Sequence, residues 1–331
     1  MLLRIGREVV NAVFRNLPIM RGAWIAVGTC MNIKPGETVV VITDIKKLKV
    51  AEAFAYASTA AGAKTTVSIM EPLKIGEKEP PKTVAEAMKA AEVVLMPTTR
   101  SLSHSDARKE ASKLGARIAS MPGITEAMMS VGGLTADYQE VAKLTNKVSA
   151  VLDKGKTVEI STPSGTRLTM SIEKRPSLRD TGLYHKAGDW GNLPAGEACL
   201  APVEGTTQGM LAIDCMGKTV GKPLRITVKD GWARKFEGPD AARFEDLLKS
   251  ADENAYNIGE LGVGTNPKAR LTGAVLEDEK VLGTVHIALG DNTSYVGGHT
   301  KSKAHYDGIL LSPTVRVDGR LIMENGKLLV G

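Results

Sequence analysis

The sequence predicts an α/β protein with two domains, an N-terminal α/β/α sandwich with a mainly parallel sheet and a C-terminal β-rich α+β domain. Three observations support this prediction. The 331 residues exceed what one hydrophobic core usually serves. The first half alternates apolar runs with helical segments. Near residue 150 the glycine density rises and helical patterns become scarce, so we expect domains at 1–150 and 151–331.

Continuous apolar runs and alanine-rich helical segments alternate between residues 38 and 120. The first run follows the turn pair Pro35-Gly36 and is apolar enough for a strand that is buried on both faces. Strands that alternate with helices imply right-handed crossovers and a parallel sheet. The expected elements are the strands 38–43, 65–70, 92–96 and 116–120, the helices 50–61, 81–90 and 106–114, and a linking helix at 136–150.

Short strands and one helix are expected in the second half. Residues 157–162 and 166–172 flank Pro163-Ser164-Gly165 and predict a β-hairpin. Further short apolar runs fit a mostly antiparallel sheet, and residues 240–254 fit a helix. The runs are 211–214, 224–229, 285–289, 309–311 and 314–317.

Composition excludes several classes of function. The formal net charge is +6, but the basic clusters are short and aromatic residues make up only 4% of the chain, so a nucleic-acid partner is not expected. Residues 1–16 interleave charged with apolar side chains, and no run is long enough for a membrane span. The cysteines Cys30, Cys199 and Cys215 are scattered and odd in number. We therefore expect a cytoplasmic protein.

Common cofactor motifs are absent. Gly155-Lys156-Thr157 resembles the end of a phosphate-binding loop but lacks the leading glycine. Gly259, Gly262 and Gly264 form a GxxGxG pattern that follows no clear strand, so a dinucleotide site is not expected.

Histidines are more informative. Three of the five, His286, His299 and His305, fall within 20 residues. His305 and Asp307 lie two apart before an apolar run, and residues two apart on a strand project from the same face. His286 interrupts an apolar strand, where it is either a hydrogen-bonded core residue or a metal ligand. The nearby pair favours the ligand interpretation, whereas His299 fits a solvated loop.

Two glutamates lie among glycines and aliphatic residues. Glu197 follows Pro194-Ala-Gly196, and Glu260 follows Ile258-Gly259. A carboxylate in such a place is costly to bury without a partner, and a metal ion is one such partner. Each could instead cap a turn or pair with a lysine. Together the three carboxylates and two imidazoles suit two divalent ions that share a water molecule, with Glu197 or Glu260 as the expected proton acceptor.

These blocks resemble the thermophilic metallo-aminopeptidases typified by aminopeptidases T and S. The similar segments are 192–197, 258–260, 279–290 and 302–307. The resemblance implies that Glu197, Glu260, His286, His305 and Asp307 are metal ligands, and it implies a homodimer. The family has a tyrosine seven residues after the first histidine, where this chain has Thr293, so Tyr295 is the catalytic candidate of that type.

The sequence is also similar in expected fold and length to the ring-opening 2,5-dihydroxypyridine dioxygenases. That resemblance implies a single ferrous ion held by two histidines and an aspartate, which His286, His305 and Asp307 could supply. The first expectation is an aminopeptidase that acts on short peptides with two divalent ions of zinc, cobalt or manganese. The alternatives are a mononuclear Fe(II) oxygenase and a metal-free binding or scaffold protein.

Overall fold

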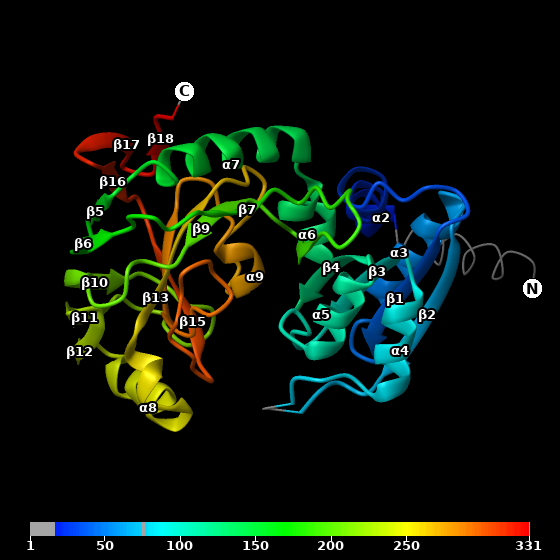
Figure 1. Cartoon of the computed structure of the whole chain (residues 1–331), viewed down its shortest axis with the longest axis horizontal. Helices are drawn as coiled ribbons and strands as arrows, with labels where there is room; N and C mark the ends of the chain where they lie inside the picture. Colours follow the sequence, from blue (N-terminus) through cyan, green and yellow to red (C-terminus); the bar gives the residue numbers. More distant parts are fainter. Residues whose placement is uncertain (1–16, 75–76, 331) are drawn as a thin grey trace, which may run out of the picture. The chain divides into compact units, whose positions relative to one another are not determined.

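The computed structural model describes residues 17–74 and 77–330, so the first 16 residues considered above lie outside the described part. The chain divides into two compact units (Figure 1). The first takes Tyr138 and the described residues before it together with Gly182–Ala195, and the second comprises Gln139–Thr181 with the described residues from Gly196 onward. The predicted boundary near residue 150 falls inside the long helix α7 (Tyr138–Leu152). The chain passes from the first unit to the second after Tyr138, returns to the first unit for Gly182–Ala195 and then enters the second unit again. One boundary in the sequence therefore does not separate the two units.

The first unit is built on a parallel five-stranded sheet of order β2-β1-β3-β4-β8. Its strands are β1 (Thr38–Asp44), β2 (Lys64–Met70), β3 (Val93–Thr98), β4 (Arg117–Pro122) and β8 (Trp190–Asn192). Its helices are α2 (Leu17–Trp24), α3 (Leu48–Ala60), α4 (Lys82–Ala90), α5 (Asp106–Lys113) and α6 (Glu126–Ser130), with a π-helical segment at Ile25–Cys30 and a 3₁₀ turn at Gly133–Thr135.

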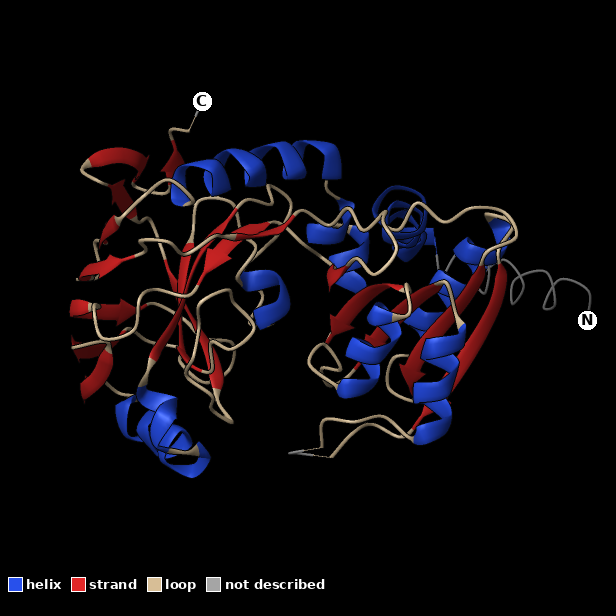
Figure 2. Cartoon of the chain, in the orientation of Figure 1, coloured by secondary structure: helices blue, strands red, loops and turns tan. Residues whose placement is uncertain are grey.

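Helices cover this parallel sheet because its central strands are apolar on both faces. Val40 and Ile42 of β1 join one buried cluster with Val84 and Met88 of α4. The alternate residue Val41 points to the opposite face, which α3 covers. The expected α/β/α sandwich is therefore confirmed, and Figure 2 shows the helices and strands of this layered arrangement.

The second unit contains two antiparallel sheets. One has the order β12-β11-β10-β6-β5-β16-β17-β18 and the other β15-β14-β13-β9-β7. The strands of the larger sheet are β5 (Thr157–Ser161), β6 (Arg167–Ser171), β10 (Gln208–Ile213), β11 (Leu224–Lys229), β12 (Trp232–Glu237), β16 (Thr314–Val317), β17 (Arg320–Glu324) and β18 (Lys327–Leu328). Those of the smaller are β7 (Leu178–Asp180), β9 (Glu197–Leu200), β13 (Ile258–Gly264), β14 (Val285–Gly290) and β15 (His305–Leu310). Buried aliphatic side chains from both sheets form one core cluster.

Three helices and a turn complete this unit: α7, α8 (Ala241–Ala251), α9 (Val275–Asp278) and a 3₁₀ turn at Glu253–Tyr256. The predicted β-rich α+β class is confirmed, and the expected hairpin is the antiparallel pair β5–β6. The sequence interpretation missed β13, because its glycines disfavour a strand pattern, and it missed the short helix α9. No helix of residues 17–74 or 77–330 is long and apolar enough to cross a membrane.

Candidate metal centre

Five carboxylate and imidazole side chains gather on one face of the smaller sheet of the second unit. Paired residues on neighbouring strands face the same side, as do residues two apart along a strand. Gly262 is opposite His286, and Ala288 is opposite Asp307. This register brings together all five residues that the sequence singled out as ligands. They are Glu197 on β9, Glu260 on β13, His286 on β14, and His305 and Asp307 on β15.

The side chains approach one another within coordination range. Nε2 of His286 lies 3.3 Å from Glu197 Oε2 and 3.3 Å from Glu260 Oε1. Nε2 of His305 lies 2.9 Å from Glu260 Oε2 and 3.3 Å from Asp307 Oδ1. Two ligand atoms at right angles around one ion are about 3 Å apart when each bond is about 2.1 Å. The cluster therefore has the dimensions of a metal site.

His305 is oriented by the backbone. Its Nδ1 donates a hydrogen bond to the carbonyl oxygen of Asp291 at 2.9 Å, which leaves Nε2 facing Glu260 and Asp307. Metal-binding histidines commonly donate their second ring nitrogen to a carbonyl in this way, because the bond fixes the tautomer and the ring orientation.

His286 is fully buried and lies against a glycine of the neighbouring strand. A methyl group added to Gly262 would lie 2.0 Å from Nε2 of His286. The close approach explains why a residue poorly suited to strands stands at this point of β13.

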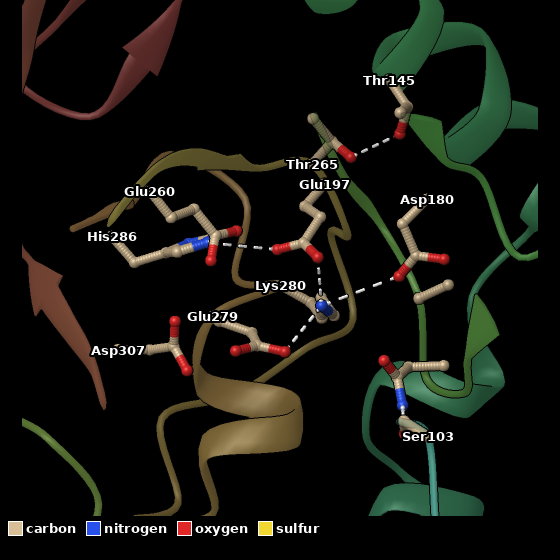
Figure 3. Close-up of polar contacts among 12 residues, drawn as sticks. Ser103, Thr145, Asp180, Glu197, Glu260, Thr265, Glu279, Lys280, His286 and Asp307 are labelled. Atoms are coloured by element: carbon tan, nitrogen blue, oxygen red, sulfur yellow. Dashed lines mark hydrogen bonds and ion pairs between the residues drawn. The ribbon is translucent and has the colours of Figure 1, made fainter. Parts of the chain in front are cut away.

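A buried lysine, which the sequence interpretation missed, completes the cluster. Lys280 follows helix α9 and is 1% exposed. Its Nζ lies 2.5 Å from Glu197 Oε1, 2.7 Å from Glu279 Oε1 and 3.6 Å from Asp180 Oδ2. Figure 3 shows the ammonium group among these three carboxylates. In sequence, Lys280 looks like an ordinary surface lysine after three acidic residues.

Burial and neighbouring charges shift the pKa values in this cluster. Burial lowers the pKa of His286, but the hydrogen bond to Glu260 and the charges of Glu197 and Asp307 outweigh burial and raise this pKa to about 9. Burial raises the pKa of Glu279 to about 8 against the opposing charge of Lys280. At neutral pH and without a metal ion, His286 is therefore charged.

The donor set fits a divalent cation. Glu197, Glu260 and His286 form one group of ligand atoms that lie within 4.8 Å of one another, and Glu260, His305 and Asp307 form a second. Glu197 Oε2 is buried and accepts no hydrogen bond from any described residue. A buried carboxylate oxygen without a donor is costly, and a cation on the His286 side would satisfy it.

Two other candidate residues lie on the loop between β14 and β15. Burial and the nearby Glu260 carboxylate raise the pKa of Tyr295 well above its usual value, so its phenol keeps its proton. His299 is exposed, and its backbone N–H donates a hydrogen bond to Glu204 at 2.9 Å. The loop therefore brings Tyr295 close enough to Glu260 for the carboxylate charge to affect the pKa of the phenol. The backbone of His299 instead holds the loop to Glu204.

Comparison with solved structures agrees with both resemblances noted in the sequence. A structure of the 2,5-dihydroxypyridine dioxygenase from Pseudomonas putida KT2440 has a TM-score of 0.81 and 16% identity, and the match covers 96% of this chain and 98% of that one. Wild-type AmpT from Thermus thermophilus has a TM-score of 0.69 and 16% identity, with 95% and 99% covered. These likenesses show the fold that the chain shares with both. No curated protein sequence matches the chain.

The family assignment comes from the sequence itself. A sequence model described as 2,5-dihydroxypyridine 5,6-dioxygenase matches residues 20–330. The match includes both units and all five candidate ligands. The chain therefore belongs to the 2,5-dihydroxypyridine 5,6-dioxygenase family.

Proposed function

We propose that the chain is a mononuclear, metal-dependent dioxygenase that opens a hydroxylated pyridine ring. The family match over residues 20–330 carries this proposal. Two imidazoles and adjacent carboxylates support it, because two histidines and one carboxylate are the ligand type of non-haem Fe(II) oxygenases. This function was an alternative in the sequence analysis, and the family match favours it over the aminopeptidase that was the first expectation.

The proposed ligands are His286, His305 and Asp307, with Glu260 in contact with both imidazoles. A bound ferrous ion would supply the redox chemistry that lets molecular oxygen react with the ring. The chain itself holds the ligands on neighbouring strands of one sheet. His286 lies on β14, which pairs with β13 and β15, and His305 and Asp307 lie on the edge strand β15, which pairs with β14.

The residues around the ligands would bind and orient the ring. The Tyr295 phenol keeps its proton at neutral pH and can donate a hydrogen bond to a ring oxygen. In a 5,6-dioxygenation the bond between C5 and C6 breaks and each carbon receives one atom of O₂. The ring supplies the four electrons that reduce O₂, so the reaction needs no external reductant.

The test is oxygen consumption by protein loaded anaerobically with Fe²⁺ and mixed with 2,5-dihydroxypyridine and O₂. We expect one O₂ consumed per ring opened, with loss of the aromatic absorbance. His305→Ala should abolish both signals, whereas exposed His299→Ala should keep them. An intact ring and no oxygen uptake by iron-loaded protein would refute the proposal.

A metallo-aminopeptidase is the second candidate. The observation that favours it is that Glu260 belongs to both groups of three ligand atoms, as a carboxylate shared by two ions would. Hydrolysis needs no O₂, so an anaerobic assay of aminoacyl amides with added Co²⁺ or Zn²⁺ separates the two functions. Release of free amino acids, lost on N-acetylation of the substrate, would favour this candidate.

A further inference from the structure

Lys280 places a positive charge inside the carboxylate cluster of the candidate metal centre. Carboxylate oxygens of Glu197 and Glu279 lie within 2.7 Å of its Nζ, and Asp180 lies 3.6 Å away. The lysine side chain is 1% exposed, so water does not screen this charge. Three carboxylates surround one small cation here, and such an arrangement is typical of the ligands around a bound metal ion.

Glu197 has a different neighbour at each of its two oxygens (Figure 3). Oε1 accepts a hydrogen bond from Lys280 Nζ at 2.5 Å. Oε2 faces His286 Nε2 at 3.3 Å and accepts no hydrogen bond from the residues described. The carboxylate is thus placed as a bridge between two positive positions. One of these positions is the ammonium group, and the other lies on the side of the imidazoles.

We propose that Lys280 is a built-in cation that fills one of two cation positions in this cluster, so that the chain binds one divalent ion and not two. The inference rests on the metal site of the proposed function and specifies its stoichiometry. The ammonium group contacts Glu197 Oε1 and the carboxylates of Asp180 and Glu279. Its positive charge repels a second divalent ion in this poorly screened interior.

The same geometry predicts what removal of the ammonium group would do. Lys280→Met keeps an apolar stem of similar length but leaves Asp180, Glu197 and Glu279 without their cation. Carboxylate oxygens suit hard divalent ions such as Mn²⁺ and Mg²⁺. The variant should therefore gain a second ion, and it should gain thermal stability when Mn²⁺ is added.

The experiment counts Mn²⁺ ions on the full chain by equilibrium dialysis and elemental analysis. Wild type should bind one Mn²⁺ per chain, and Lys280→Met should bind two. Lys229→Met is the matched control, because Lys229 is an exposed residue of β11, and it should bind one. In Lys280→Met/Asp180→Asn the second ion should bind at least about tenfold more weakly, since one of its carboxylates is gone. Circular dichroism checks that each variant is folded.

Two Mn²⁺ per chain in wild type would overturn the inference, and this measurement does not depend on how well the variant folds. A folded Lys280→Met that still binds one ion would overturn it as well. Oxygen uptake is a separate readout. One ion per chain without oxygen uptake would refute the proposed dioxygenase and leave the role of Lys280 standing. Two ions per chain with oxygen uptake would overturn the role of Lys280 and leave the dioxygenase activity standing.

Discussion

The His286 imidazole lies directly against Gly262 of the neighbouring strand, and a Cβ at residue 262 would come within 2.0 Å of Nε2. Gly262→Ala should therefore push the ring out of the site. Because both residues are buried, we expect a loss of about 1–3 kcal/mol in the free energy of unfolding. Metal affinity should fall by at least about tenfold. Urea denaturation and Mn²⁺ titration measure the two effects.

Gly221→Ala is the matched control for this substitution. An added Cβ at Gly221 meets no atom within 4 Å. The control should retain metal affinity and change stability by less than about 0.5 kcal/mol. Equal metal affinity in Gly262→Ala and Gly221→Ala would contradict a ligand role for His286.

A second prediction separates ligands from bystanders. His305→Ala and Asp307→Ala should each weaken metal binding by more than about 100-fold, because each removes one ligand of a small set. His299→Ala should keep full affinity, since the hydrogen bond between residue 299 and Glu204 uses the backbone N–H. Full metal content in His305→Ala would exclude that imidazole from the site.

Metal affinity should rise with pH. The carboxylates around His286 raise its pKa to about 9, so below that pH the metal-free imidazole carries a proton that the ion must displace. Burial lowers the pKa of His305, but the charges of Asp307 and Glu260 and the hydrogen bonds to them together outweigh burial and raise this pKa as well. Affinity should therefore increase between pH 6 and 9 by up to about tenfold per unit for each proton released.

Calorimetry in buffers of different ionisation enthalpy counts these protons. We expect release of one to two protons per ion at pH 7. An affinity that does not change between pH 6 and 9 would mean that the imidazoles are already neutral before the ion binds.

Glu204 should anchor the loop that carries Tyr295. Its carboxylate accepts hydrogen bonds from Asn292 Nδ2 at 2.8 Å and from the His299 N–H at 2.9 Å, and it pairs with Arg175. Burial raises the pKa of Glu204, but these bonds and the Arg175 charge outweigh burial and lower it. Glu204→Gln should cost about 1 kcal/mol at pH 7, a value reduced for partial exposure.

The pH dependence of this effect has a definite sign. A carboxylate whose pKa is lowered in the folded state stabilises the fold at any pH above its pKa in the unfolded chain, which is about 4.3 for a glutamate. This contribution is lost as the pH falls through the pKa of the folded state. The difference between wild type and Glu204→Gln should therefore shrink below about pH 4. Urea denaturation at pH 7 and pH 3 measures it. Glu237→Gln, which alters a surface pair with Lys235, should change stability by less than about 0.5 kcal/mol.

The fold of the first unit could be predicted from the sequence because its signals are local. The run Thr38–Thr43 is apolar on both faces and is followed by a helix that ends before a glycine, and each feature is visible within a few residues. The strand Trp190–Asn192 was not predicted, because three residues are too short to show a period, and only its pairing with β4 defines it.

The sequence by itself determined the residue types of the candidate centre, since two imidazoles and several carboxylates among apolar runs are costly unless they share a partner. Only the tertiary structure decided how they combine. Strand register placed His286, Glu260 and Asp307 on one face, although 47 residues separate the last two along the chain. The three-dimensional structure also buried Lys280 among three carboxylates. Sequence patterns report local periodicity, whereas these contacts depend on pairing between strands distant in sequence and on the loss of solvent around the charges.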